Sequence, residues 1–383
     1  MKILIIHNKY QTNNIGGEDI VYQNELKLLV DKLGKDNIFF YEVSNDNINK
    51  FKLIFEIWFS FKHYKNIKKI IRDKHIDLVH IHNFFPLLTP SAFKAAKNAG
   101  AKTIHTLHNY RFWCISGIFY RDGYGICELC VKNKFSFQGI LNKCYRKSFL
   151  QSIVAQASFW FYKMAGSFSY IDYFFVLTNF QKEKIKSLGV DSNKIILKPN
   201  GVFVSSSISL EKQNYIYVGR LEESKGICEL LKIWRNLDKK FILNIVGIGD
   251  LEQKLKSEFL SENIIFHGKC DRKKTLTLIS SSKYLIQPSL LYETFGLTII
   301  EAMGFGIPVI GYNIGTRSDF IKDNVNGFLA DNGKLNEIIQ KSFEYKKYND
   351  LSKNAIDTAK MYENEYIINM QIEIYKQILE DKI

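Results

Sequence analysis

The sequence predicts an α/β protein of two doubly wound domains that face a central cleft. Its 383 residues are too many for one ordinary core. Short apolar runs alternate with helical stretches along the whole chain, which is the pattern of parallel sheets with crossover helices. Ligands of such sheets bind beyond the carboxyl ends of the strands, so the residues that follow each strand are expected to carry the function.

The first domain is predicted to cover residues 1–205 and the second residues 206–361, with a polar stretch at 205–213 as the linker. The last segment, 362–383, has Ile, Met and Tyr at helical spacing and is predicted to form a helix that packs back toward the first domain. Strands are expected at 2–7, 37–43, 77–82, 101–107, 172–178 and 194–198 in the first domain, and at 214–219, 241–247, 263–268, 284–289 and 307–312 in the second.

The net charge of +14 lies entirely in the first domain. Residues 1–205 hold 29 Lys or Arg against 15 Asp or Glu, whereas residues 206–383 hold 24 of each. A polyanionic partner is therefore expected to face the first domain, and nucleic acid, anionic lipid headgroups and phosphorylated substrates all fit this excess.

No window is apolar for long enough to predict a membrane span, and the most apolar stretch, 148–162, is expected to be a buried helix. The first residues, "MKILIIHNKY", lack the long apolar run of a signal peptide. The protein is therefore expected in the cytosol, where its six cysteines are thiols or metal ligands.

The segment 51–75 is predicted to be a basic amphipathic helix. Such a helix suits an anionic membrane surface, although its apolar side suits the protein core equally well. Because the first domain carries the excess positive charge, we expect it to contact the membrane peripherally. The apolar stripe would be Ile54, Ile57, Trp58, Phe61, Tyr64 and Ile71, and the basic stripe Lys62, Lys65, Lys69 and Arg72.

The run "YETFGLTIIEAMGFGIPVI" (292–310) carries two glutamates around a glycine turn. Glu293 is predicted to lie in the loop after a strand, and Glu301 on the helix that follows. The backbone N–H groups of Phe295, Gly296 and Leu297 would then form an anion site at the helix N-terminus. Two carboxylates beside a phosphate site suit the hydroxyl groups of a nucleotide sugar, whereas the alternative makes both glutamates solvated surface charges.

Two further loops strengthen this interpretation. Arg220 and Lys225 follow the first strand of the second domain in "GRLEESKG", and Gly247 and Gly249 follow the next strand in "VGIGDLE". Together these loops supply cations and backbone donors for a diphosphate.

These motifs resemble the donor domain of retaining GT-B glycosyltransferases of family four. The resemblance rests on "YVGRLEESKG", "NIVGIGDLE", "IQPSLLYETFGLTIIEAMGFGIPVIGYNIG" and "NGFLA" in the second half, and on "GGED", "DLVHIHN", "TLHNYRFWC", "VLTNFQKEKI" and "KPNGV" in the first. It covers nearly the whole chain and implies two Rossmann-like domains. The forms "GGED" and "HNYR" are similar to the subgroup that builds bacterial capsule and lipopolysaccharide chains.

The resemblance also implies roles for individual residues. Glu301 would bind the ribose and Glu293 the transferred sugar, while Arg220 and Lys225 would hold the diphosphate. Gly16 and Gly17 would approach the phosphates from the first domain, and His108 would reach the sugar or the phosphate bridge. Asp319 stands where the family more often has glutamate, which leaves the contact of that helix open.

The acceptor is expected to be a lipid-linked glycan of the O-antigen or capsule type. Asn83 is expected to lie near it and Arg111 to meet its phosphate, although a surface ion pair explains Arg111 equally well. The donor would be UDP- or GDP-linked. The alternatives are a nucleotide-sugar epimerase on a similar frame and a basic nucleic-acid-binding protein, but no nucleic-acid motif appears and no nucleic-acid partner is expected.

The chemistry is expected to be retaining and to need no cofactor. The chain has no Asp-x-Asp, so no metal is expected to bridge the diphosphate. Glu293 resembles the nucleophile of a retaining glycosidase, but the family resemblance implies a front-side reaction in which the leaving phosphate takes the acceptor's proton. Cys114, Cys127, Cys130 and Cys144, within an insertion at 111–147, suit either a structural zinc or a set of reduced thiols.

Overall fold

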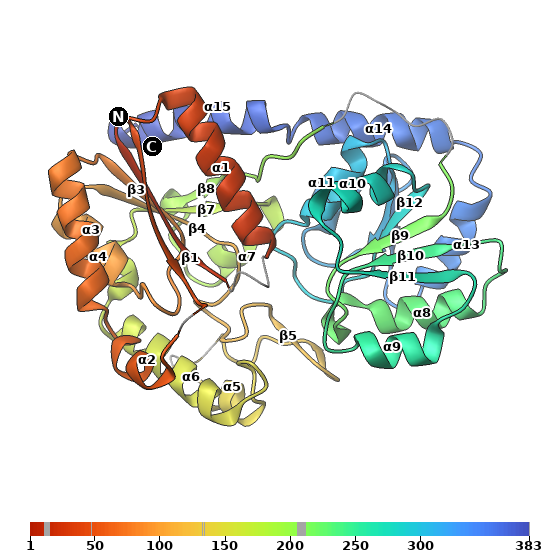
Figure 1. Ribbon diagram of the computed structural model, residues 1–383, viewed down its shortest axis with the longest axis horizontal. Helices are drawn as coiled ribbons and strands as arrows, with labels where there is room; N and C mark the ends of the chain where they lie inside the picture. The colour runs from red at the N-terminus through yellow and green to blue at the C-terminus, as the bar shows by residue number, and fades with distance from the viewer. Residues whose placement is uncertain (11–15, 47, 132, 134, 205–211, 383) are drawn as a thin grey trace. The chain divides into compact units, whose positions relative to one another are not determined.

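The computed structural model describes residues 1–10, 16–46, 48–131, 133, 135–204 and 212–382, and it divides the chain into two compact α/β units (Figure 1). The first unit consists of residues 1–118, 128–201 and 365–383. The second consists of residues 119–127 and 202–364. Each unit has its own parallel sheet and its own core.

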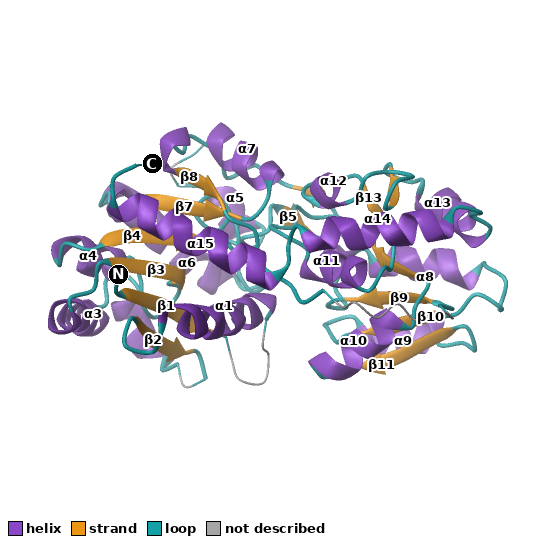
Figure 2. Ribbon diagram, turned by 90° about the horizontal axis from the view of Figure 1, so that it is seen from above, coloured by secondary structure: helices purple, strands orange, loops and turns teal. Residues whose placement is uncertain are grey.

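The first unit is built on a sheet of six parallel strands in the order β2-β1-β3-β4-β7-β8 (Figure 2). The order changes direction between β1 and β3, and in doubly wound sheets such a switch point marks where ligands bind. The strands are β1 (Ile3–Lys9), β2 (Ile38–Ser44), β3 (Leu78–Asn83), β4 (Lys102–Thr106), β7 (Tyr173–Val176) and β8 (Ile195–Leu197).

Helices connect these strands and cover the sheet. Several begin at a side-chain cap, as α6 does at Ser148 and α7 at Thr178, where the hydroxyl accepts a hydrogen bond from a backbone N–H of the first turn. The helices are α1 (Gly17–Leu33), α2 (Lys50–Glu56), α3 (Phe61–Lys74), α4 (Ser91–Asn98), α5 (Phe137–Leu141), α6 (Phe149–Met164), α7 (Asn179–Ser187) and α15 (Asn364–Leu379), with short 3₁₀ turns at Ser167–Tyr170 and Ser192–Lys194.

The C-terminal helix α15 completes the core of the first unit. Its Ile368, Ile372, Tyr375 and Ile378 pack with Ile3 and Ile5 of β1, Tyr22 and Leu29 of α1 and Leu78 of β3. Burying four such side chains contributes roughly 1.5–3 kcal/mol each, so a helix far along the sequence is part of the first unit.

The second unit repeats the design with a sheet in the order β11-β10-β9-β12-β13-β14. This is the Rossmann order, and its switch point falls between β9 and β12. The strands are β9 (Tyr215–Val218), β10 (Leu243–Val246), β11 (Ile264–Gly268), β12 (Tyr284–Gln287), β13 (Val309–Tyr312) and β14 (Gly327–Ala330). The helices are α8 (Ile227–Arg235), α9 (Glu252–Phe259), α10 (Arg272–Ser280), α11 (Leu297–Gly304), α12 (Arg317–Phe320), α13 (Leu335–Phe343) and α14 (Tyr348–Lys360), with a 3₁₀ turn at Glu223–Lys225.

The insertion at 111–147 is divided between the two units. Its hairpin, β5 (Tyr120–Arg121) and β6 (Gly125–Ile126), belongs to the second unit, because the N–H of Gly123 donates to Glu223 at 2.7 Å and Phe119 packs against Tyr292. The sequence had assigned the whole insertion to the first domain. It also missed this hairpin and β14, whose strands are only two and four residues long.

Two helix predictions were wrong in detail. The segment 51–75 is not one helix but two, because the hydroxyl of Ser60 caps a new helix by accepting from the N–H of His63. Helix α6 is not fully buried, since Leu150 and Met164 are more than half exposed. The predicted linker lies mostly outside the described residues. Across the described part of the chain, no helix is both long enough and apolar enough to cross a membrane.

Candidate functional site

An ion pair between Lys225 and Glu293 stands at the switch point of the second unit. The Lys225 ammonium lies 2.7 Å from Glu293 Oε1, and the two side chains are 19% and 15% exposed. Ser289 and Gln287 donate to the same oxygen at 2.7 and 3.2 Å. The structure therefore joins two of the residues that the sequence predicts for catalysis, one after β9 and one after β12.

A close approach of two loops produces this pair. Gly226 has a φ of +70°, and a Cβ at that position would lie 1.9 Å from the carbonyl oxygen of Pro288. The N–H of Leu290 also donates to the carbonyl of Ser224 at 2.9 Å. Only glycine permits this contact, which brings the loop after β9 against the loop after β12.

Arg317 supports the loop that carries Glu293. Its guanidinium is fully buried and donates to the carbonyl oxygens of Tyr312 and Ser289 and to Gln287 Oε1, at 2.7, 2.6 and 3.3 Å. The sequence reasoning missed this residue. The available signal was its position in "GTRSDF", at the start of α12 in the segment that follows β13, because Arg220 and Lys225 also follow a strand.

The pair fixes the charge of Glu293. Burial alone would raise the pKa of this carboxyl, but the charge and hydrogen bond of Lys225 and the hydroxyl of Ser289 hold the pKa at about 2. Glu301 differs, since burial raises its pKa and Arg272, 2.7 Å away, offsets only part of that effect. Arg272, at the start of α10, is a second residue that the sequence reasoning did not identify.

The other residues predicted to bind the donor lie at the same sheet edge but are not all free for a ligand. Arg220 is 58% exposed and pairs with Glu222 at 2.8 Å. Gly247 and Gly249 pack against backbone, because a Cβ would come within 1.9 Å of Gly219 and 2.5 Å of Leu221. These contacts account for both glycines, and their role in donor binding stays a prediction.

The start of α11 has the predicted turn. Gly296 caps the helix in the left-handed region at a φ of +98°, and Leu297 is the first helical residue. The side chain of Phe295 is buried against Phe320 and Tyr362, so only its backbone is available to a ligand. A role for this turn in anion binding is untested.

In the first unit, a chain of hydrogen-bonded buried groups joins α1, β3 and the segments that follow β4 and β8. Lys198, after β8, lies 2.6 Å from Glu25 Oε2 on α1. The other oxygen, Oε1, interacts with His82 Nε2 at 3.1 Å, and His82 Nδ1 lies 3.0 Å from His108 Nε2. His108, which the sequence predicts to reach the sugar or phosphate, is thus connected to the core of the unit.

This chain of hydrogen bonds determines the charge of Glu25 and which ring nitrogen of His82 and His108 carries a proton. Burial would raise the pKa of Glu25, but Lys198 and the two histidines that donate to it hold the pKa well below its ordinary value. Burial lowers the pKa of His82 to about 3, so His82 is neutral and its single proton is on the nitrogen that faces Glu25. His108 must therefore donate through Nε2, which leaves Nδ1 of His108 as a hydrogen-bond acceptor.

Glu25, His80 and His82 are the one group of the described residues whose ligand atoms are close enough together to hold a metal. Their atoms already have partners. Lys198 forms an ion pair with Glu25, and the ring nitrogens of His80 form hydrogen bonds with Tyr375 and Thr106 at 2.6 Å each. An ammonium 2.6 Å from the carboxylate supplies the positive charge that a metal would bring, so these residues fit a hydrogen-bonded network better than a metal site.

The four cysteines are not part of that group, and Cys114 Sγ lies 3.1 Å from Ser116 Oγ. A zinc site formed by Cys114, Cys127, Cys130 and Cys144 stays a prediction.

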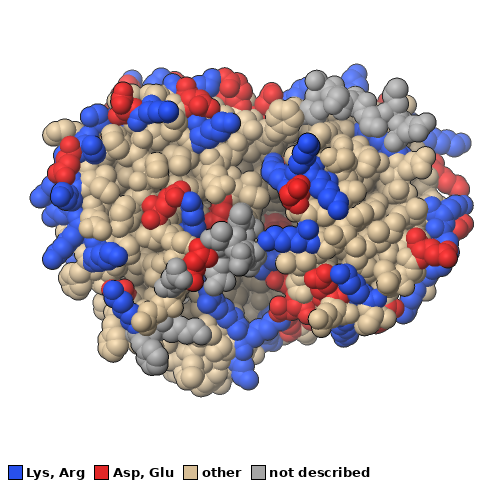
Figure 3. Space-filling model, in the orientation of Figure 1, with Lys and Arg blue, Asp and Glu red and all other residues tan. Residues whose placement is uncertain are grey.

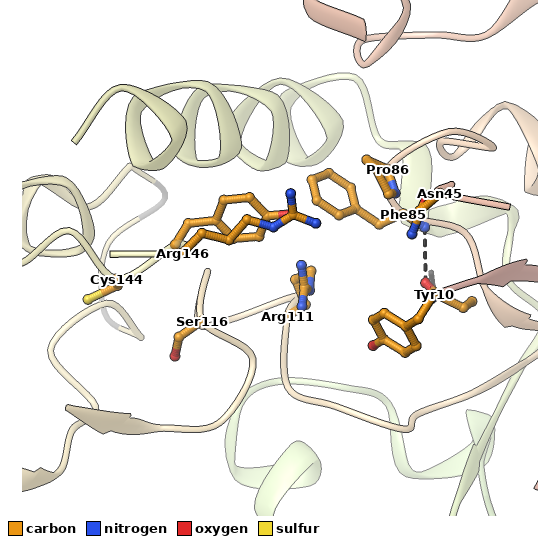
Figure 4. Close-up of a pocket in the computed structure, with 10 residues that line it drawn as sticks. Tyr10, Asn45, Phe85, Pro86, Arg111, Ser116, Cys144 and Arg146 are labelled. Atoms are coloured by element: carbon orange, nitrogen blue, oxygen red, sulfur yellow. Dashed lines mark hydrogen bonds between the residues drawn. The ribbon is translucent and has the colours of Figure 1, made fainter. Parts of the chain in front are cut away.

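Asn83 and Arg111 lie on one pocket at the carboxyl end of β1 and β3, with a cavity volume of about 150 Å³ (Figure 4). Gly16 lies nearby and caps α1, where its N–H donates to Asp19 Oδ2 at 3.1 Å, and Gly17 is the first residue of that helix. Tyr10, which packs beside Gly16, is part of the pocket wall. The two residues predicted to meet the acceptor thus line one cavity, and their role stays a prediction.

Comparison with known proteins matches both halves of the chain. Residues 34–205 match the family model described as Glycosyltransferase Family 4, and residues 203–360 match Glycosyl transferases group 1. An uncharacterized 41.2 kDa protein in the cps region of Klebsiella pneumoniae is 26% identical over 49% of this chain and 56% of that protein. The chain spans about half the length of the curated relatives it matches.

Solved structures share the fold across the full length. The lipopolysaccharide outer core galactosyltransferase WaaB, in its apo form, has a TM-score of 0.66 and 20% identity, covering 100% of both chains. Anabaena HepE in complex with UDP also has a TM-score of 0.66, at 17% identity, covering 98% of this chain and 100% of that one.

The two Rossmann-like units have the GT-B fold that these solved structures share. The first half of the chain matches the family 4 model and the second half the group 1 model. The predicted fold class is confirmed.

The buried Lys198–Glu25 pair predicts strong coupling between the two residues. Replacing either one, as Glu25→Gln or Lys198→Met, leaves an uncompensated buried group and is expected to cost about 3–5 kcal/mol of unfolding free energy. The double variant should cost clearly less than the sum, measured by urea denaturation. Lys376→Met, in an exposed pair on α15, is the control and should change stability by at most about 0.5 kcal/mol. Additive losses would contradict the pairing.

The low pKa of Glu293 predicts a defined dependence of stability on pH. A depressed pKa adds stability that is present above pH 4.5 and is lost as the pH falls toward 2. The stability difference between the wild type and Glu293→Gln is therefore expected to shrink by about 2 kcal/mol between pH 6 and pH 3. Unfolding at several pH values measures it, with the exposed Glu344→Gln as the surface control. A constant difference would exclude the ion pair.

Proposed function

We propose that the protein transfers a sugar, with retention, from a UDP- or GDP-linked donor to a lipid-linked acceptor of a surface polysaccharide. The observation that carries this proposal is the Lys225–Glu293 pair at the switch point of the second sheet. Three findings support the choice of donor and acceptor. They are the GT-B fold, the UDP bound by HepE, and the location of the Klebsiella relative in a cps region.

The charges of the second unit suit the departure of a nucleoside diphosphate. Lys225 donates one of its three N–H groups to Glu293, which leaves the others for a phosphate oxygen. Arg220, exposed at the same strand end, offers a planar fork for a second oxygen. These fixed cations would stabilise the charge that develops on the leaving group without a metal, in line with the absence of Asp-x-Asp.

Glu293 suits electrostatic stabilisation better than nucleophilic attack. Its Oε1 accepts from Lys225, Ser289 and Gln287, and donors that stabilise the negative charge make the whole carboxylate a weaker base and a weaker nucleophile. Because its pKa is about 2, the carboxylate is ionised at neutral pH and can stabilise an oxocarbenium-like centre and accept hydrogen bonds from sugar hydroxyls. We therefore favour a front-side reaction in which the diphosphate takes the proton of the acceptor.

Turnover of nucleotide sugars tests this function directly. Incubation with a panel of UDP- and GDP-sugars should show one donor that slowly loses its sugar. Arg220→Ala and Lys225→Ala are each expected to lower kcat for that donor by ~10²–10³. Lys240→Ala removes an exposed lysine of the same unit and should leave turnover unchanged. No hydrolysis of any donor, or full turnover by both variants, would refute the proposal.

We also propose that the first unit contacts a membrane, because a lipid-linked acceptor is presented there. Exposed lysines and Arg72 lie along α3, and Figure 3 shows basic side chains gathered at that edge. Beyond α3, apolar side chains are exposed on adjoining helices, where Trp58 contacts Phe161 and α5 packs against α6. This apolar face consists of Ile54, Phe55, Phe137, Leu141, Phe149, Leu150, Trp160, Phe161 and Met164.

Vesicle binding measures the contribution of the apolar face. The Phe55→Asp/Leu150→Asp double variant replaces two side chains that are 81% and 73% exposed, so its folding should be little affected. Binding to vesicles that contain anionic lipid is expected to fall at least tenfold in co-sedimentation, because two apolar side chains are lost and two like charges added. Leu260→Asp, at an exposed leucine of the second unit, is the control. Equal binding by all three proteins would contradict membrane contact through this face.

A further inference from the structure

The pocket of the first unit has two arginines in its wall and no carboxylate among its lining residues. It lies at the carboxyl ends of β1, β2 and β3, and its volume of about 150 Å³ is far more than a single water needs. The residues of the wall are Tyr10, Asn45, Asn83, Phe85, Pro86, Arg111, Ser116, Cys144, Tyr145 and Arg146.

Aromatic rings hold the two arginines in place. The guanidinium of Arg111, in the loop after β4, lies 5.3 Å from the ring centre of Phe85 and 5.4 Å from that of Tyr145. Arg146, between α5 and α6, lies 5.5 Å from the same Tyr145 ring. A guanidinium against a ring face keeps its N–H groups at the edge, available for an anion. Figure 4 shows the two guanidinium groups turned toward one another in the pocket.

The charge of the two arginines is not neutralised within the pocket. In the described part of the chain, neither guanidinium has a carboxylate within ion-pairing distance. Glu18 accepts from the Tyr10 hydroxyl of this wall, and burial and the neighbouring Asp19 raise its pKa to about 8, although Tyr10 and the charge of Arg111 act to lower it. It is therefore mostly protonated at neutral pH, and the pocket keeps two positive charges.

Asn45 adds a neutral donor to the floor. It is 6% exposed and its Oδ1 accepts from Asn8 Nδ2 at 2.9 Å, while no hydrogen bond from its NH₂ group is found among the described residues. Asn83, in contrast, uses both ends, donating to the carbonyl of Asn8 at 2.9 Å and accepting from the N–H of Phe85 at 3.1 Å. Asn83 therefore shapes the pocket, while Asn45 is able to bind a ligand oxygen.

We propose that this pocket binds the phosphoryl or diphosphoryl group of the lipid-linked acceptor, held by Arg111 and Arg146 with Asn45 at the floor. The assignment rests on the proposed function and names the chemistry of its acceptor. A lipid carrier is preferred over a free anion because Phe149 and Leu150, exposed residues of the apolar face described above, follow Arg146 by three and four positions.

Binding of farnesyl diphosphate, without any donor sugar, tests the assignment. Titration calorimetry is expected to show binding at least tenfold tighter than that of farnesol or of inorganic pyrophosphate. Arg111→Gln and Arg146→Gln should each weaken it at least tenfold, since each removes a charged fork from the phosphate. Lys143→Gln removes one positive charge from the same loop outside the pocket and should change binding less than twofold. Circular dichroism and thermal unfolding of each variant confirm folding.

Each contrary result has a distinct meaning. If pyrophosphate binds as tightly as farnesyl diphosphate, the pocket holds free anions and the lipid assignment fails. If the arginine variants weaken UDP as much as the prenyl diphosphate, the pocket belongs to the donor. Unchanged binding of farnesyl diphosphate by both variants removes the site altogether. Since no sugar is transferred in this assay, prenyl diphosphate binding that persists while all donors are inert would refute the proposed transferase and leave the phosphate site standing.

Discussion

A charge that is removed from water must find a partner, and this constraint shapes the strand ends of both units. In the second unit the partners are Lys225 and Glu293, and in the first they are Lys198 and Glu25. Each pair joins residues that are far apart in the sequence. It therefore also holds together the two segments that carry them, the loops after β9 and β12 in one unit and α1 and the segment after β8 in the other. The groups expected to meet a ligand, His108 and Glu293, are held by these pairs or belong to them.

The local chemistry of the sequence was sufficient to predict the fold and most loop positions. Apolar runs of strand length, each followed by polar residues, predicted eleven of the strands, because parallel strands buried on both faces read as continuous apolar runs. The same logic placed Lys225 and Glu293 at strand ends. It did not predict that they touch, since their contact depends on the approach of Gly226 to Pro288, which is a tertiary feature.

The residues that sequence reasoning missed are those whose role depends on packing. Arg317 resembles a surface arginine in the sequence, yet it is fully buried, and the carbonyl oxygens of Tyr312, Ser289 and Leu291 accept from its guanidinium. Arg272 pairs with Glu301 across two helices, and Arg146 lies against the ring of Tyr145. The long basic helix was predicted from the periodicity of its apolar residues alone. That periodicity carries no information about caps, whereas a serine such as Ser60 favours a helix N-cap over a helix interior.

The position of α15 in the core of the first unit also affects how the chain is made. Ribosomes add roughly 5–20 residues per second, so the more than 160 residues of 202–364 emerge before the segment that covers β1 and β3. For tens of seconds or less, Ile3, Ile5 and Leu78 lack the side chains that later cover them. A nascent chain in that state exposes an apolar surface that favours aggregation. We therefore expect molecular chaperones to bind this protein mainly during that interval.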